Sequence, residues 1–199
     1  MKTRIFIETS RHTTSEYVFI DTLLKAMGKS QSSYEIQCVG GKDNLRNLEN
    51  KFLENTLEGG CNIIIFDADS PETGSGFEAS RERILHTFSS GIKIDGLFLF
   101  PDNHSDGIFE NLLVALAQKK AHARFFDCFS DYEKCLGEDY VSPDIKGKLH
   151  TYMSAQKALT KKQHDLLGIG QCLFDDTRFW NLDSEAIQPL KRFLEAYVV

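Results

Sequence analysis

Two aspartates one residue apart end a run of apolar residues in the first half of the chain. The stretch NIIIFDADS, residues 62–70, places Asp67 and Asp69 directly after four consecutive apolar residues. Because side chains of a strand alternate between its faces, Asp67 and Asp69 are expected to point the same way. Like charges on one side repel unless a cation lies between them, and carboxylate oxygens suit Mg²⁺ or Mn²⁺. The pattern therefore predicts a divalent metal site.

Alternating strands and helices are expected to position this pair. The strand patterns are apolar and rich in Ile, Val and Phe, as in strands that are buried on both faces. The alternation predicts an α/β fold with a mostly parallel four-stranded central sheet flanked by helices. The expected strands cover residues 3–8, 33–41, 61–69 and 94–101, and the expected helices cover 12–28, 43–60, 74–94 and 106–120.

The alternation of strand and helix patterns weakens after about residue 125. Residues 131–138 and 144–159 have helical patterns, and a terminal helix is expected over 184–199. A chain of 199 residues is long enough for one sizeable core. We therefore expect a single domain over residues 1–199, in which a core of residues 1–125 carries a mostly helical extension, 126–199, packed on it.

Carboxylates end three of the four expected strands. Glu8 ends the first strand, Asp67 and Asp69 end the third, and Asp102 follows the fourth. Glu110 lies in the next expected helix. Parallel strands bring their carboxyl ends to one edge of the sheet, which is where ligands of such sheets bind. We expect Glu8, Asp67 and Asp69 to hold Mg²⁺ or Mn²⁺, with Asp102 and Glu110 as candidates for additional ligands.

Composition argues against several classes of protein. A net charge of −6 at pH 7 argues against coating nucleic acid by bulk electrostatics, and it leaves room for a local basic groove. No apolar run approaches the length of about 18 residues that a membrane-spanning helix needs, so no membrane partner is expected. Five cysteines without a CxxC pair and the lack of a signal-peptide pattern indicate reduced thiols and a cytoplasmic location. The histidines form no HxH or HExxH pattern, which argues against zinc.

The order of these motifs resembles that of the Toprim (topoisomerase–primase) domain. An apolar strand ending in Glu8, then a helix, a strand, a helix and an apolar strand ending in Asp67-Ala-Asp69, matches its pattern over roughly residues 4–125. Over nearly the whole chain, the sequence resembles an uncharacterised bacterial family of compact stand-alone Toprim-like proteins. A more distant resemblance is to the overcoming-lysogenization-defect nucleases. The segments that carry the closer resemblance are IFIE, IIIFDADS, FLFPDN followed by GIFE, WNLD and PLKRFL.

This resemblance implies a Toprim-like, Rossmann-like fold and a role for the carboxylates. In Toprim domains the glutamate and the aspartate pair bind magnesium and support phosphoryl transfer, so Glu8, Asp67 and Asp69 take catalytic and metal-binding roles by resemblance. The implied activity is a metal-dependent nuclease or phosphotransferase that acts on phosphodiesters of DNA or RNA. The sequence departs from the pattern at Thr9, because many Toprim domains have glycine after the glutamate.

Two other functions stay open on the sequence. A non-catalytic protein could keep the Toprim fold and act as a regulatory or defence-associated module, with a protein partner or as a homo-oligomer. A haloacid-dehalogenase-type phosphatase also has an apolar strand that runs into DxD, and FDDT at 174–177 could mimic its later acidic motif. That family usually starts its core domain with the DxD strand, whereas a strand-helix-strand-helix unit precedes it here. If nucleic acid binds, some of the basic residues expected near this edge, a set that includes Arg81 and Arg83, must offset its acidic charge.

Overall fold

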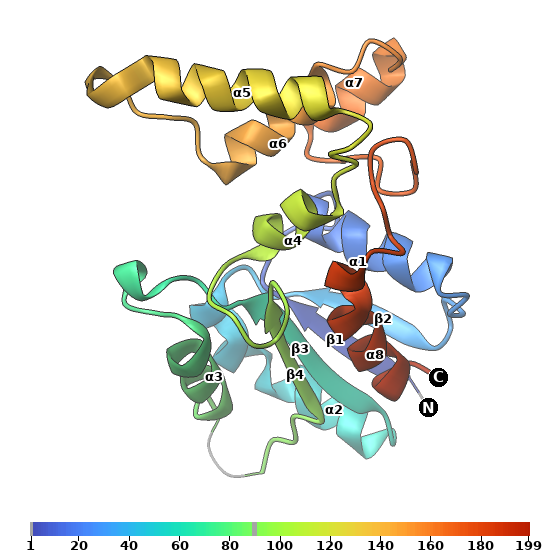
Figure 1. The fold of residues 1–199 in the computed structure, drawn as a ribbon. Helices are drawn as coiled ribbons and strands as arrows, with labels where there is room; N and C mark the ends of the chain where they lie inside the picture. Colours follow the sequence, from blue (N-terminus) through green and yellow to red (C-terminus); the bar gives the residue numbers. More distant parts are fainter. Residues whose placement is uncertain (1, 89–90) are drawn as a thin grey trace.

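A parallel sheet forms the centre of the molecule in the computed structural model, which describes residues 2–88 and 91–199 (Figure 1). Its strands are β1 (Thr3–Ile7), β2 (Tyr34–Cys38), β3 (Cys61–Asp67) and β4 (Gly96–Phe100). They pair in parallel in the order β2-β1-β3-β4, so the first strand of the chain lies inside the sheet. The α/β fold with a four-stranded central sheet, expected from the sequence, is confirmed.

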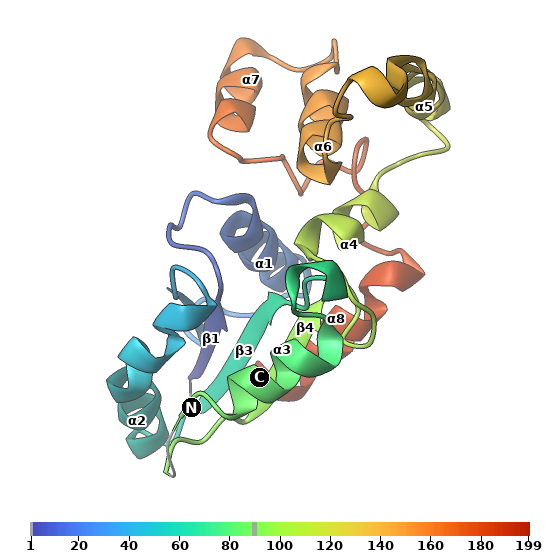
Figure 2. The ribbon, with the colours of Figure 1, turned by 90° about the vertical axis from the view of Figure 1, so that its left-hand side faces the viewer.

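Helices cover both faces of this sheet (Figure 2). One face packs against α2 (Glu49–Leu57) and α3 (Phe77–Leu85), and the other against α1 (Ser15–Ala26), α4 (Phe109–Leu116) and α8 (Gln188–Tyr197). Adjacent residues of one strand serve opposite cores, because strand side chains alternate. Phe6 lies in the core beneath α2 and α3, whereas Ile5 and Ile7 lie in the core beneath α1 and α8. Both faces are covered, which explains the unbroken apolar runs.

A second layer of helices stands beyond the carboxyl ends of the strands (Figures 1 and 2). It contains α5 (Ala123–Leu136), α6 (Ile145–Ser154) and α7 (Lys161–Gly168). The ring of Tyr152 on α6 is fully buried and contacts the rings of Phe126 and Trp180. The helix predicted at 131–138 begins earlier than expected, because aromatic side chains near its start bury against α6. Among the described residues, no helix combines the length and the apolar character needed to cross a membrane.

Two local features differ from the sequence expectations. The helix expected over 43–60 begins as a 3-10 turn, η1 (Lys42–Leu48), before α2. Asp106 begins the range 106–120 expected as a helix, but α4 starts only at Phe109. The Oδ1 of Asp106 instead accepts the backbone N–H of Phe77 at 2.6 Å, and Asp106 therefore caps α3. The reason is tertiary, since the loop after β4 lies against the start of α3.

Both ends of the described chain lie at the amino ends of the strands, away from the second layer (Figure 1). The hydroxyl of Thr3, at the start of β1, donates to the carbonyl oxygen of Tyr197, and the ammonium of Lys29 donates to that of Val198. The ring of Tyr197 also lies against Gly96 at the start of β4. Helix α8 is thus attached to the first and the last strand along the chain.

Substitution of Gly96 should report on this packing. A Cβ atom at Gly96 would lie 2.6 Å from Cε2 of Tyr197 and 3.0 Å from Cε2 of Phe193. Because both rings would have to shift, Gly96→Ala should lower the free energy of unfolding by about 1–3 kcal/mol. Gly168→Ala is the matched control, since nothing lies within 4 Å of its added carbon. Urea unfolding followed by circular dichroism measures both variants, and equal stability would contradict the packing of α8 on β4.

Candidate functional site

Strand pairing places Glu8 beside Asp67 at the carboxyl edge of the sheet. Ile7 of β1 lies opposite Ile65 of β3, so Glu8 leaves the sheet next to the end of β3. The backbone N–H of Asp67 donates to Oε2 of Glu8 at 3.5 Å, a long hydrogen bond. Glu8 and Asp67 line a pocket of about 460 Å³. Glu110 at the start of α4 lines the same pocket, so the structure brings together three of the residues that the sequence singled out.

Asp69 belongs to a different environment from Asp67, although the sequence suggested that both point the same way. Strand β3 ends at Asp67, and Asp69 has a left-handed backbone with φ of 61°. Its backbone exchanges hydrogen bonds of 2.8 and 2.7 Å with Gly107, which turn the chain away from the strand direction. The carboxylate of Asp69 forms an ion pair with Lys42 of η1. Strand alternation therefore no longer applies at Asp69.

The carboxyl group of Asp67 is buried among other acids. Burial raises its pKa to about 7, and the charges of Glu8, Glu110 and Asp69 act in the same direction. One contact opposes this shift, because the backbone N–H of Phe109 donates to Oδ1 of Asp67 at 2.7 Å. The start of α4 thus supplies a hydrogen bond to the charged form of Asp67, but this bond lowers the pKa by less than burial raises it.

Two neighbouring glutamates share this excess of negative charge. Burial raises the pKa of Glu8, and the ammonium of Lys42, 3.9 Å from its Oε2, lowers it in part. Glu16, in the first turn of α1, accepts the backbone N–H of Glu8 at 3.4 Å. Burial raises the pKa of Glu16 well above its ordinary value, and the charges of Asp67 and Glu8 add to the effect. The pocket therefore holds more carboxyl groups than its cations neutralise.

The remaining two predicted ligands have different surroundings. Nζ of Lys146, on α6, lies 3.6 Å from Oε1 of Glu110, so the second layer of helices contributes a cation to the pocket. Asp102 does not line this pocket. Its carboxylate accepts the N–H groups of His104 and Ser105 at 3.0 and 2.7 Å. Burial alone would raise the pKa of Asp102, but these hydrogen bonds outweigh it and lower the pKa.

The chemistry of the donors suits a metal better than their present arrangement does. Glu8, Asp67 and Asp69 offer only carboxylate oxygens, which Mg²⁺ and Mn²⁺ prefer. Within residues 2–88 and 91–199, however, no group of three His, Cys, Asp or Glu side chains is arranged to hold a metal ion. The ammonium of Lys42 lies against Asp69 and close to Glu8. A divalent ion would therefore have to displace Lys42 from these carboxylates.

Sequence reasoning missed three residues of the site, Glu16, Lys42 and Lys146. Glu16 carried a weak signal, because it is the first acidic residue of the helix that follows the strand of Glu8. Lys42 comes directly after the glycine pair that follows β2, and such a position at the ligand-binding edge is a signal that could have been used. Lys146 carried no local signal, because only the fold of the second layer brings it to Glu110.

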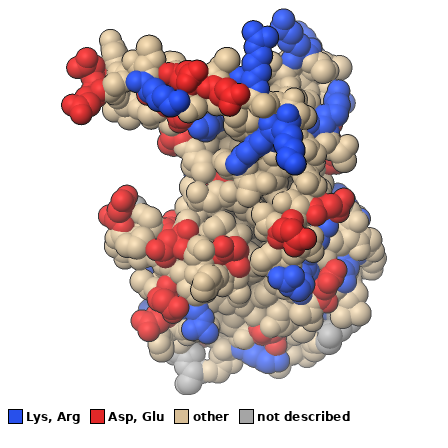
Figure 3. Space-filling model, viewed as in Figure 1, with Lys and Arg blue, Asp and Glu red and all other residues tan. Residues whose placement is uncertain are grey.

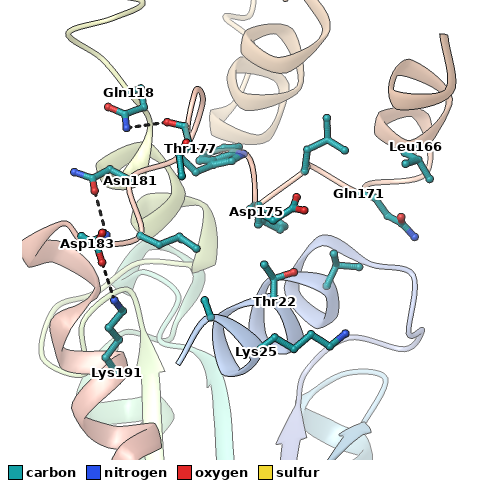
Figure 4. A pocket seen from close by; sticks show the side chains of 16 residues that line it. Thr22, Lys25, Gln118, Leu166, Gln171, Asp175, Thr177, Asn181, Asp183 and Lys191 are labelled. Carbon is teal, nitrogen blue, oxygen red and sulfur yellow. Dashed lines mark hydrogen bonds and ion pairs between the residues drawn. The ribbon is translucent and has the colours of Figure 1, made fainter. Parts of the chain in front are cut away.

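A larger pocket, of about 1070 Å³, lies between α1 and the loop before α8 (Figure 4). Several of its polar side chains bond within the protein: Gln118 donates to the carbonyl of Thr177 at 3.1 Å, and Lys191 lies 3.4 Å from Asp183. Asp175, from the FDDT segment, lines this pocket, which shares no lining residue with the carboxylate pocket. No residue of the FDDT segment lines the pocket that contains Asp67.

Charge is unevenly distributed over the surface. On the face in Figure 3, Lys and Arg side chains gather over α7 and the nearby end of α5. The same view shows a deep notch between the second layer of helices and the layer that contains the sheet.

Comparison with known proteins gave one match. A family model described as "Protein of unknown function (DUF3226)" matches residues 13–198. The matched range begins after Glu8 and includes Asp67, Asp69 and Glu110. No curated protein and no solved structure matched the chain.

Asp67→Asn should stabilise the metal-free protein at alkaline pH. The pKa of Asp67 is about 7 in the folded state, against an ordinary value of 3.8. Between these values the folded state binds more protons than the unfolded state, so stability falls as pH rises through this window. Asparagine does not ionise and can still accept the N–H of Phe109. We expect the variant to gain about 1–3 kcal/mol over the wild type at pH 8.

Urea unfolding in EDTA at pH 5 and pH 8 measures this difference. Asp131→Asn is the control, because the side chain of Asp131 is 76% exposed on α5. An Asp67→Asn protein that is less stable than wild type at pH 8 would contradict the buried, charge-crowded environment of Asp67.

Proposed function

The chain belongs to the DUF3226 family, and from its carboxylate pocket we propose a Mg²⁺- or Mn²⁺-dependent protein that cleaves or transfers phosphodiesters of nucleic acid. The observation that carries this proposal is the meeting of Glu8 and Asp67 at the carboxyl edge, with Asp69 and Glu110 close enough to raise the pKa of Asp67. Buried acids that lack enough cations favour binding of an added positive ion.

Glu8, Asp67 and Asp69 would hold the ion, and Glu110 would add a further oxygen. The ion would supply charge neutralisation and a more acidic bound water. Glu8 would act as a ligand or as a general acid–base group, because its raised pKa lies closer to neutral pH than that of a free glutamate. The N–H of Phe109 would keep the carboxylate of Asp67 oriented while it binds.

A second function is favoured by Lys42. Its side chain is only 9% exposed. Its ammonium already neutralises part of the negative charge of the carboxylate cluster, which consists of Glu8, Asp67, Asp69 and Glu110. A protein that needs no metal would use such a built-in cation. This observation supports a non-catalytic binding or regulatory module, which would engage a protein partner or a second copy of the chain.

Metal titration separates the two functions. If the ion binds as proposed, Asp67→Asn and Asp69→Asn should each weaken Mn²⁺ binding by about tenfold or more, which is about 1.4 kcal/mol. Lys42→Met should strengthen it, because the ion no longer competes with an ammonium for Asp69. Isothermal titration calorimetry of each variant measures these changes, with Asp131→Asn as the control that should match wild type. Equal Mn²⁺ affinity in wild type, Asp67→Asn and Asp69→Asn would refute the metal site.

Cleavage assays test the activity itself. Purified protein is incubated with single- and double-stranded DNA and RNA, with Mg²⁺, with Mn²⁺ and with EDTA. Glu8→Ala and Asp67→Ala should each reduce metal-dependent cleavage by about 100-fold or more, because each removes a carboxylate that would bind the metal ion. Asp131→Ala should cleave like wild type. Cleavage that persists in Glu8→Ala and Asp67→Ala would come from a contaminant, and a lack of cleavage with every substrate would favour the non-catalytic module.

A further inference from the structure

A third pocket, lined mainly by basic side chains, borders the carboxylates of Glu8 and Asp69. It has a volume of about 380 Å³ and lies between η1 and the end of α3. Three of its lining residues are permanent cations, Lys42, Arg46 and Arg83, and His86 adds a group that can become positive. The full lining consists of Lys42, Asp43, Arg46, Arg83, Ile84, His86 and Thr87.

The two arginines of this pocket are held by neutral groups. Nε of Arg46 donates to the carbonyl oxygen of Thr87 at 3.1 Å. Nη2 of Arg83 lies 3.3 Å from Oγ of Ser75 and 3.5 Å from Oγ of Ser80. Among the residues that the structure describes, neither arginine forms an ion pair with a carboxylate. No carboxylate therefore neutralises either guanidinium group within this part of the structure, and both have further N–H donors available for an anion.

Lys42 links the basic pocket to the carboxylates of Asp69 and Glu8. Its ammonium contacts Asp69 and lies 3.9 Å from Glu8, while its side chain lines the basic pocket. The charge of Arg83 also reaches the cluster, because it lowers the pKa of Glu8. An anion in the basic pocket would therefore lie next to the carboxylates, and Lys42 could contact it after leaving Asp69.

We propose that Arg46, Arg83 and Lys42 form a site for a backbone phosphate of a single nucleic-acid strand, beside the phosphodiester held at the carboxylate cluster. This inference rests on the proposed function. Guanidinium groups offer paired N–H donors that match phosphate oxygens. A protein with net charge −6 and an acidic site repels a polyanion, so it needs a local cationic contact to hold a strand in place.

Binding without cleavage tests this site. Fluorescence anisotropy of a labelled single-stranded oligonucleotide is measured in EDTA for the full chain. Arg46→Gln with Arg83→Gln should weaken binding by about tenfold or more. The slope of log affinity against log salt should become shallower by about 0.7 for one lost phosphate contact. Arg81→Gln is the matched control, because Arg81 lies on the same helix but does not line the pocket.

Competitors identify the bound chemistry. Inorganic phosphate and a nucleoside monophosphate should displace the strand at high concentration in wild type, whereas polyglutamate of similar charge should not. Unchanged affinity in the double variant, an equal loss in Arg81→Gln, or equal competition by polyglutamate would each overturn the phosphate site. Circular dichroism and the two single variants, Arg46→Gln and Arg83→Gln, exclude misfolding as the cause of a loss.

The same proteins keep this test separate from the metal proposal. Arg46→Gln with Arg83→Gln should not weaken Mn²⁺ binding, because neither arginine is a metal ligand and the loss of the Arg83 charge near Glu8 removes repulsion of the ion. If oligonucleotide binding depends on these arginines but the protein binds no Mn²⁺, the phosphate site is supported and metal-dependent cleavage is refuted. If the protein binds Mn²⁺ and its affinity for the oligonucleotide is the same with and without both arginines, the phosphate site alone is refuted.

Discussion

The pairing of β1 with β3 forces two carboxyl groups together at a partly buried edge, and the surrounding structure adapts to that contact. Ile7 and Ile65 are register partners, so Glu8 and Asp67 leave the sheet side by side. In water each acid would be well solvated, but beneath covering helices their repulsion is screened far less. A lysine from η1, the start of α4 and a lysine from α6 all reach this edge, and each supplies positive charge or an N–H donor.

Phe109 shows how the hydrophobic core fixes a polar contact. Its ring packs against the rings of Phe19, Phe100 and Phe174, which are buried. The backbone N–H of the same residue donates to Asp67. Because the ring cannot leave the core without creating a cavity, the donor is held in place by apolar packing. A change in this part of the core would therefore alter the site as well as stability.

The sheet and the neighbouring positions of Glu8 and Asp67 could be predicted because they depend on local patterns. Apolar runs mark buried strands, and parallel strands share a carboxyl edge. The direction of Asp69 could not be predicted, because it depends on a backbone bridge to Gly107 in a loop that follows another strand. Lys42 reaches the carboxylates only through the turn of η1. The helical character of the C-terminal part was predicted correctly, but the early start of α5 and the whole of α7 were not, since contacts between distant aromatic side chains rather than regular periodicity define the second layer.

The meeting of the two chain ends at the amino ends of the strands has a practical consequence for handling the protein. Thr3 and Tyr197 are joined by a hydrogen bond on the side of the sheet opposite to Glu8 and Asp67. A fusion domain, an affinity tag or a surface anchor at either end would therefore project away from the carboxylate edge. A short peptide could also join the ends, which would allow circular permutation with new termini opened in an exposed loop.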